Sequence, residues 1–367
     1  EMSKILADGD KFLFSDYCEI AIDDELIKSY NRINISKFVL PLDSSIIQAA
    51  PGCGKTTYIL NNVNFDSNRC TVLLATREGR TDFISRFEKK FDVTLDESQK
   101  KLIRTVASYL VNYEDNFKSE IMYIDEALMS HPGQLFFAIA LCEPKTVRFL
   151  GDMLQIPYVN RTPSCKTKYD KLVDFVKVSK TLYISYRCPV DIAYRLNPHY
   201  LEFNKTFGFS NGMKSVNHCL HSCKFVRISN DHSYPIDKSV QYLTFTQSEK
   251  QKLLSHGLNV STVHEFQGKE APIIYVVRIN PYPQDEIFLR FNYALVAITR
   301  HSKNLIYYTR VTTDALSRLI AVDGKLCKTI APEDDIKTCI EKTAGSVFEI
   351  MKYEFTNDLT TINFTTT

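Results

Sequence analysis

The segment APGCGKTT, residues 50–57, constrains the fold more than any other part of this chain. It follows the apolar run SSIIQAA, which predicts a buried strand, and it leads into a predicted helix. A glycine-rich turn between a strand and a helix surrounds a phosphate with backbone N–H groups at the positive end of the helix dipole. The sequence therefore predicts a phosphate-binding loop. Its expected nucleotide contacts are Pro51, Gly52, Cys53, Gly54, Lys55, Thr56 and Thr57.

Two side chains of this loop have expected chemical roles. Lys55 would reach the β- and γ-phosphates of a nucleotide, and the Thr56 hydroxyl would bind magnesium. The strict motif begins with glycine where this chain has Ala50, and a chance glycine-rich turn is the alternative interpretation. Cys53 is interpreted as a tolerated loop residue rather than a nucleophile.

Elsewhere the chain alternates short β-branched and aromatic runs with helical stretches. Such alternation predicts βαβ units and a parallel sheet covered by helices on both faces. The expected strands are 44–50, 70–76, 120–127, 146–152, 181–186, 239–246, 271–279 and 304–310. The expected helices are 56–62, 79–91, 133–140, 191–200, 247–256 and 287–299. The pattern restarts after a basic connector, so we expect an α/β fold with two halves in series and a junction near residue 180.

Carboxylates follow the predicted strand in MYIDEAL, at the sheet edge where open α/β folds bind ligands. Asp125 would hold magnesium, and Glu126 would orient and deprotonate an attacking water. The alternative is an exposed acidic turn. A third strand end, FLGDMLQIPY, offers Asp152 and Gln155 as sensors of a γ-phosphate, although such a turn is common after a strand.

Two arginines of the second half are candidates to neutralise charge in the transition state of phosphate hydrolysis. Arg187 lies in SYRCPVDI, at the end of a predicted strand. Arg300 lies in ALVAITRH, at the end of a predicted helix. The alternative for each is an ordinary surface salt bridge.

The net charge of +2 conceals a basic middle section. Residues 1–30 carry −5 and residues 331–358 carry −4, so residues 31–330 carry +11. A basic body suits a polyanionic ligand, and solvated surface lysines would account for part of it. The connector at 161–180 is interpreted either as one wall of an RNA channel or as a solvated linker.

The ten cysteines are scattered, which is typical of reduced thiols rather than of a disulfide framework. One local cluster, NHCLHSCKF, leaves structural zinc as a minority interpretation against a loop-to-strand transition. Its possible ligands are His218, Cys219, His221 and Cys223. No apolar run approaches the roughly 18–20 residues of a membrane span, and no signal peptide is visible, so a soluble intracellular protein is expected.

Taken in order, the motifs resemble those of superfamily 1 RNA helicases from alphavirus-like plus-strand RNA viruses, with most likeness to the tobamovirus replicase helicase domain. The segments that carry the resemblance are APGCGKTT, LLATRE, MYIDEALM, FLGDMLQIPYVNR, YISYRCP, STVHEFQGKEA and NYALVAITRHSKNLIYYT. The resemblance implies two RecA-like domains with ATP in the cleft between them, and translocation on RNA of unassigned polarity.

The resemblance also implies residue roles. Arg187 and Arg300 become arginine fingers, and Gln267 and Gly268 would contact the γ-phosphate or couple it to RNA. The residues that would face the nucleic acid are Thr76, Arg77, Tyr158, Thr262 and His264.

Four sections are expected: an accessory segment at 1–43, RecA-like domains at 44–180 and 181–345, and a tail at 346–367. The implied activity is an ATP- and magnesium-dependent RNA helicase, accompanied by RNA 5′-triphosphatase activity at the same site. The implied setting is the host cytoplasm, at membrane-associated replication complexes with methyltransferase and polymerase domains. The alternative is a helicase-like movement or scaffold protein whose NTPase acts as a switch.

Overall fold

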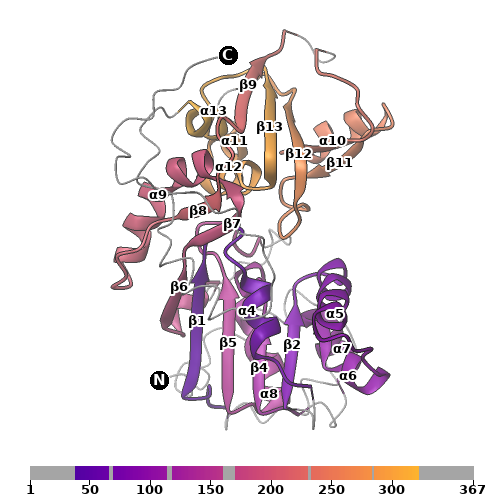
Figure 1. The fold of residues 1–367 in the computed structure, drawn as a ribbon, viewed down its shortest axis with the longest axis vertical. Coiled ribbons are helices and arrows are strands. Elements are labelled where there is room, and N and C mark those ends of the chain that lie inside the picture. Colours follow the sequence, from indigo (N-terminus) through magenta and orange to yellow (C-terminus); the bar gives the residue numbers. More distant parts are fainter. Residues whose placement is uncertain are drawn as a thin grey trace, which may run out of the picture.

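The computed structural model describes residues 38–65, 69–113, 118–159, 170–229, 233–282 and 285–321 of the chain. Most of the expected accessory segment, the first part of the basic connector and the expected tail lie outside these residues. Figure 1 shows the described part as two α/β halves stacked along the long axis.

The first half contains a parallel sheet of six strands in the order β3-β2-β4-β5-β1-β6. Its strands are β1 (Asp43–Ala49), β2 (Cys70–Leu74), β3 (Ile103–Thr105), β4 (Ile121–Ile124), β5 (Thr146–Gly151) and β6 (Val178–Leu182). Its helices are α4 (Lys55–Asn62), α5 (Arg77–Phe91), α6 (Glu97–Lys101), α7 (Val106–Val111) and α8 (Pro132–Cys142), with short 3₁₀ turns at Ala127–Met129 and Leu172–Asp174.

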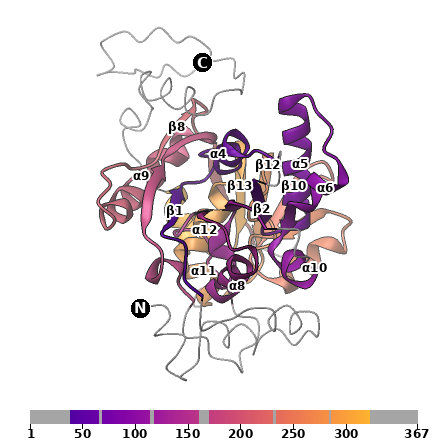
Figure 2. The same ribbon diagram turned by 90° about the horizontal axis from the view of Figure 1, so that it is seen from below.

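Both faces of this sheet are buried because the strands are apolar at successive positions. Ile47 packs with residues of α4 and α5, whereas its neighbour Ile46 packs with residues of α7 and α8. Figure 2 shows α4 and α8 on opposite sides of the strands. The phosphate loop thus lies at the carboxyl ends of the strands, which face the second half (Figure 1).

The second half contains a parallel sheet of five strands in the order β11-β10-β12-β13-β9 and a separate pair, β7-β8. Its strands are β7 (Ile184–Pro189), β8 (Lys214–Asn217), β9 (Cys223–Arg227), β10 (Gln241–Thr244), β11 (Asn259–Thr262), β12 (Ala271–Arg278) and β13 (His301–Thr309). Its helices are α9 (Val190–Lys205), α10 (Gln247–Leu254), α11 (Glu286–Leu289), α12 (Phe291–Ile298) and α13 (Ala315–Ile320).

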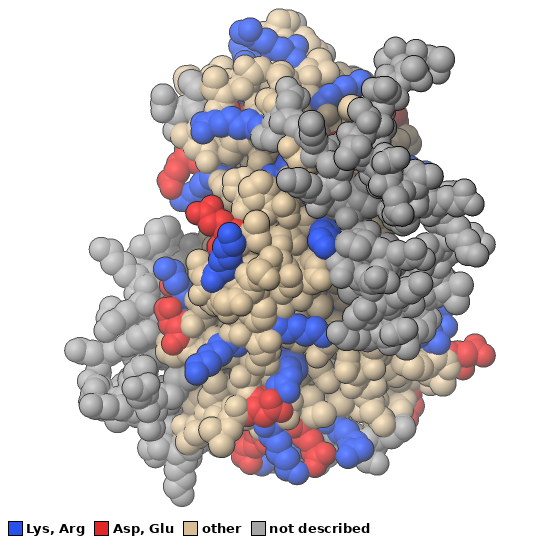
Figure 3. Space-filling model, turned by 60° about the vertical axis from the view of Figure 1, so that its left-hand side comes forward, with Lys and Arg blue, Asp and Glu red and all other residues tan. Residues whose placement is uncertain are grey.

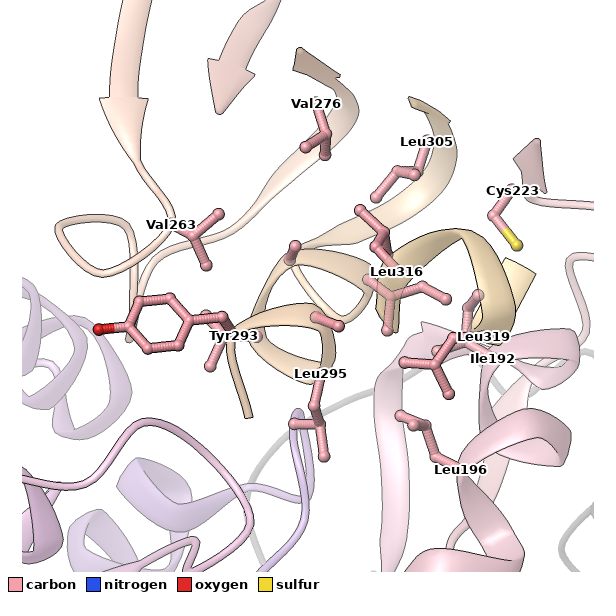
Figure 4. Packing of buried hydrophobic residues seen from close by; sticks show 14 of the residues in the cluster. Ile192, Leu196, Cys223, Val263, Val276, Tyr293, Leu295, Leu305, Leu316 and Leu319 are labelled. Carbon is pink, nitrogen blue, oxygen red and sulfur yellow. The ribbon is translucent and has the colours of Figure 1, made fainter. Parts of the chain in front are cut away.

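The largest apolar cluster belongs to this half and extends into the first. Side chains of α9, α12 and α13, among them Leu196, Leu295 and Leu316, converge below the strands (Figure 4). Ala50 of the phosphate loop and Ile156, which follows β5, are buried in the same cluster. We call these contacts the apolar seam, because they join the two halves behind the phosphate loop.

Two sequence predictions were wrong in detail. The predicted strand at 181–186 is two strands: β6 completes the first sheet beside β1, and β7 pairs with β8. The predicted helix at 287–299 is broken at Arg290, whose ψ of 119° is extended and separates α11 from α12. Strands β3, β8 and β11 and helices α6, α7 and α13 were not predicted, since each is short and lacks a clear periodicity. No helix in the described ranges is both long and apolar enough to cross a lipid bilayer.

A buried ion pair links β12 to the start of α13, and its loss is expected to destabilise the fold. Arg278 Nη1 lies 2.6 Å from Asp314 Oδ2, which also accepts a 2.6 Å hydrogen bond from the Tyr307 hydroxyl. Asp314→Ala would leave the Arg278 charge buried without its partner, so we expect the free energy of unfolding to fall by roughly 3–5 kcal/mol. Denaturant titration measures this change.

The matched control is Glu286→Ala, which removes the carboxylate of the exposed Arg290–Glu286 pair. Its expected cost is below about 1 kcal/mol. Equal effects of the two substitutions would contradict the role assigned to the buried pair.

Candidate active site

The phosphate loop owes its path to two glycines. Gly52 has φ 71° and Gly54 has φ 78°, in the left-handed region that residues with a Cβ rarely adopt. Gly54 is also the residue that precedes α4, so the helix begins at Lys55 with its free N–H groups toward the loop. A cavity of about 310 Å³ opens here. It is lined by Gly52, Cys53, Gly54, Lys55, Thr56, Thr57, Asp82, Arg86, Glu126, Tyr186, Arg187, Gly268, Glu270, Arg300 and Ser302.

The loop is held from behind by the strand that carries Arg187. The Tyr186 N–H donates to the Gly52 carbonyl at 2.9 Å, and the Ser185 hydroxyl donates to the Pro51 carbonyl at 2.8 Å. A Cβ on Gly52 would lie only 2.7 Å from Arg187 Cβ, so no larger residue fits without movement. We call these contacts the loop clamp. They fix the Arg187 backbone beside the phosphate loop.

Thr56 and Asp125, the two predicted magnesium ligands, are in contact. The Thr56 hydroxyl donates to Asp125 Oδ2 at 2.9 Å, and Asp125 follows β4 at the carboxyl edge of the sheet. Burial raises the pKa of Asp125 to about 6, and the neighbouring charge of Glu126 adds to this rise. A hydroxyl and a buried carboxylate are oxygen donors of the kind magnesium takes, so these two residues fit that ion.

Lys55 is surrounded by carboxylates. Its Nζ lies 3.2 Å from Glu126 Oε1, and Asp125 and Asp152 are also close enough to act on it. Burial alone would lower the pKa of Lys55, but these three negative charges outweigh burial and raise it. Lys55 therefore stays charged at neutral pH, which its predicted contact with phosphates requires.

Asp152 and Gln155 form a buried network rather than an exposed turn. Asp152 accepts hydrogen bonds from Gln48 Nε2 at 2.8 Å, from the Tyr200 hydroxyl at 2.5 Å and from Gln155 Nε2 at 3.0 Å. Burial is the main cause that raises the pKa of Asp152, although Lys55 opposes it. The side-chain carbonyl of Gln155 in turn accepts from Arg300 Nη2 at 3.5 Å. The network thus connects β1, the segment after β5 and α9 to an arginine of the second half.

The two predicted arginines both line the cavity, but they are held differently. Arg300 is buried against carbonyls of its own half, and burial lowers its pKa to about 10, with the charge of Arg187 acting in the same direction. Arg187 Nη1 pairs with Glu270 Oε2 at 3.0 Å, while Arg187 Nε is buried without a hydrogen-bond partner among the described residues.

A second cavity of about 350 Å³ adjoins the first. The residues that line both are Thr56, Asp82, Arg86, Glu126, Gly268 and Glu270. Gln267 lines the second cavity, and its side-chain amide donates to the Ile156 carbonyl at 3.4 Å. Gly268 lies beside both cavities with φ 84°.

The residues expected to face RNA differ in burial and in the elements that carry them. Thr76 accepts from the Gly79 N–H as the cap of α5 and lines the second cavity, while Arg77 is exposed. The Tyr158 ring lies 5.3 Å from that of His131. Thr262 is buried and receives a 3.2 Å hydrogen bond from the Glu265 N–H, and the neighbouring His264 is half-buried. Their roles toward RNA remain predictions.

The possible zinc ligands are not arranged for a metal. Cys219 Sγ contacts the Lys303 carbonyl at 3.3 Å, and Cys223 opens β9 with its sulfur 3.9 Å from Asp191 Oδ2. Across the described ranges, no group of three His, Cys, Asp or Glu side chains is placed to hold a metal ion. The cluster is a loop-to-strand transition, and the zinc interpretation was wrong.

Sequence reasoning missed the pair Asp82 and Arg86 on α5, as well as Glu270. Asp82 and Arg86 are four residues apart and bonded at 2.9 Å, which in a sequence is typical of an ordinary helix surface. Glu270 was within a recognised motif but had no role assigned to it.

The sequence of this chain matches a known protein family and known viral proteins. The viral superfamily 1 RNA helicase core domain family matches residues 45–309. The replicase large subunit of soil-borne wheat mosaic virus is 37% identical over 305 residues, covering 77% of this chain and 16% of that protein. That of tobacco mosaic virus (strain OM) is 31% identical over 324 residues, covering 86% of this chain and 19% of that protein.

The chain therefore spans less than a fifth of the length of these two relatives. Among solved structures, arterivirus nonstructural protein 10 (helicase) in complex with DNA is 16% identical, with a TM-score of 0.50. The alignment covers 85% of this chain and 68% of that one, and it shows a shared fold of RecA-like domains. From the family match and these relatives, the chain belongs to the viral superfamily 1 RNA helicases.

Proposed function

We propose that this chain hydrolyses nucleoside triphosphates, ATP among them, beside the phosphate loop and uses the reaction to move along RNA within a viral replicase. The observation that supports it best is the pair of contacts at the loop: Thr56 with Asp125, and Lys55 with Glu126. Both contacts lie beside one cavity that two arginines also line. This set of groups serves phosphoryl transfer to water, because that reaction needs positioning and charge stabilisation more than covalent chemistry.

Glu126 is the proposed general base. In the structure its carboxylate pairs with Lys55, and a bound β,γ-phosphate would compete for the same ammonium group. Glu126 would then be free to orient a water molecule and accept its proton. Thr56 and Asp125 would hold magnesium, which neutralises phosphate charge when bound.

The arginines have distinct proposed roles. Arg187 is fixed beside the loop by the loop clamp, so it would stabilise phosphate charge as soon as the nucleotide binds. Arg300 belongs to the second half and reaches Gln155 through a long 3.5 Å contact. Movement of the second half would change that contact. Arg300 and Gln155 would therefore couple the presence or loss of the γ-phosphate to closing or opening of the cleft.

RNA binding is proposed to run over both halves. Figure 3 shows lysines and arginines spread along one face, with acidic side chains among them, rather than gathered in one patch. The proposed grip contacts the RNA backbone independently of base sequence. The arterivirus helicase was solved with DNA, which supports nucleic-acid binding by this fold. Thr76, Arg77, Tyr158, Thr262 and His264 are the proposed contacts. Methyltransferase and polymerase domains of the same replicase, at membrane-associated sites in the host cytoplasm, are the proposed partners.

The first test is ATP hydrolysis by the chain with and without single-stranded RNA. We expect RNA to stimulate turnover, and Lys55→Ala to reduce it at least about a hundredfold, because the lysine holds the phosphates. A strand-displacement assay follows if stimulation is seen. Turnover that needs Lys55 but ignores RNA would favour the scaffold or switch alternative, and absence of any turnover would contradict the proposal.

Glu126→Gln separates binding from chemistry. The amide keeps the size of the side chain but cannot accept a proton, so we expect turnover to fall roughly 10²–10⁴-fold. Affinity for a non-hydrolysable ATP analogue, measured by fluorescence titration, should stay within about threefold of wild type. Equal loss of binding and turnover would mean that Glu126 supports the site structurally.

RNA 5′-triphosphatase activity is proposed at the same site, since the contacts proposed for the loop are with phosphates and not with a base. Release of γ-phosphate from 5′-triphosphorylated RNA should therefore disappear in Lys55→Ala, and excess ATP should inhibit it competitively. Activity that survives in this variant would place the triphosphatase elsewhere.

A further inference from the structure

The Arg187–Glu270 ion pair joins two parts of the molecule that are anchored differently. Arg187 is fixed next to the phosphate loop by the loop clamp. Glu270 directly precedes β12 of the second sheet, after the turn that contains Gly268. Their nitrogen and oxygen lie 3.0 Å apart, with 12% of the Arg187 side chain and 56% of the Glu270 side chain exposed. The pair therefore bridges the phosphate-loop region and the second half.

Glu270 satisfies only part of the Arg187 guanidinium. One nitrogen, Nη1, contacts the carboxylate, while Nε is buried and has no hydrogen-bond partner in the described ranges. A guanidinium fork binds phosphate through two parallel hydrogen bonds, which is a stronger arrangement than a single contact with a half-exposed carboxylate. A triphosphate in the cavity would therefore take Arg187 from Glu270.

A second arginine is available to Glu270 from the first half. Arg86 of α5 and Glu270 line both cavities together. Among the described residues, Arg86 forms an ion pair with Asp82 on the same helix and with no other carboxylate, and both side chains are about half exposed, at 50% and 53%. Pairs of this kind contribute only about 0.3–0.5 kcal/mol, so Arg86 can exchange partners at little cost.

The two residues of this contact belong to separately anchored parts of the molecule. Helix α5 is anchored by the buried rings of Phe83 and Phe87 and by the Arg80 side chain, which donates to the carbonyls of Ile103 and Lys100. Near Glu270, by contrast, a Cβ added to Gly268 would meet nothing within 4 Å. Glu270 itself lies between two bonded positions, because the Ala271 N–H donates to the Arg300 carbonyl and Arg300 Nη1 donates to the Lys269 carbonyl. Movement of the second half as a body would therefore carry Glu270 with it, and the turn at Gly268 has open space beside it.

We propose that Glu270 changes partners during the reaction cycle, from Arg187 to Arg86, and that the Arg86–Glu270 pair holds the second half closed over the bound triphosphate. Arg86 is thus a positioning residue for hydrolysis, and Glu270 links occupation of the phosphate site to domain closure. The proposal rests on the proposed NTPase function. It assigns no direct chemical step to either residue.

The decisive test is a charge exchange, measured as RNA-stimulated ATP turnover by the 367-residue chain. Arg86→Glu and Glu270→Arg each place like charges together in the closed state, so we expect kcat to fall about tenfold or more in each. The double variant restores opposite charges and should recover to within about threefold of wild type. If the fold loss of kcat in the double variant equals the product of the two single losses, the residues do not interact, and the proposal is overturned.

The matched control is the same exchange at Arg290 and Glu286, an arginine–glutamate pair that lines neither cavity. Arg290→Glu, Glu286→Arg and their double variant should all keep turnover within about twofold of wild type. A loss and rescue of equal size at this site would mean that the assay reports general stability, and the proposal would fail.

Glu270→Gln gives an independent readout that a structural role would not produce. Removing the carboxylate frees Arg187 for phosphate, so binding of a fluorescent non-hydrolysable ATP analogue should be unchanged or up to about tenfold tighter, while kcat falls. Weakened binding together with lowered kcat would overturn the partner exchange. Because analogue binding is measured without turnover, a wild-type chain that binds but does not hydrolyse would contradict the proposed function separately.

Discussion

Strand β7 packs so closely against the phosphate loop that the loop backbone cannot move toward it, and the rest of the site follows from that constraint. Hydrogen bonds from Ser185 and Tyr186 reach the carbonyls of Pro51 and Gly52, and a single added carbon at Gly52 would collide with Arg187. Arg187, which lies in the second half by its place in the sequence, is therefore expected to move together with the phosphate loop. Motion between the halves must act through groups further along the chain, namely Arg300, Gln267 and Glu270.

The charges of the site are balanced as one group. Lys55 lies among carboxylates that keep it protonated, while burial and mutual repulsion raise the pKa of Asp125 and burial raises that of Asp152. Each buried charge is thus tolerable only because an opposite charge is near. A nucleotide bound with magnesium brings negative charge on its phosphates and positive charge on the metal ion. It can therefore replace these internal contacts without leaving a buried charge unpaired.

Much of this was predictable because short apolar strands and the residues at their carboxyl ends are local signals. Lys55, Thr56, Asp125 and Glu126 were placed together on that basis, and the structure brings them into contact. Other features depend on distant partners. The stretch 181–186 is one unbroken run of β-branched, aromatic and other strand-forming residues, and only pairing with β1 or β8 decides where one strand ends and another begins. Arg86 looks like a helix-surface residue until the second half is packed beside it.

The apolar seam has a consequence for how such domains can diverge. Ala50 stands where the strict phosphate-loop motif has glycine, and it is buried in a cluster made mostly of second-half side chains. Its methyl group is therefore part of a packing surface that both halves must share. Halves exchanged between related viruses by recombination would meet at this surface. A mismatch of one methylene in the packing there would displace the phosphate loop. The two halves are thus expected to be inherited as a unit.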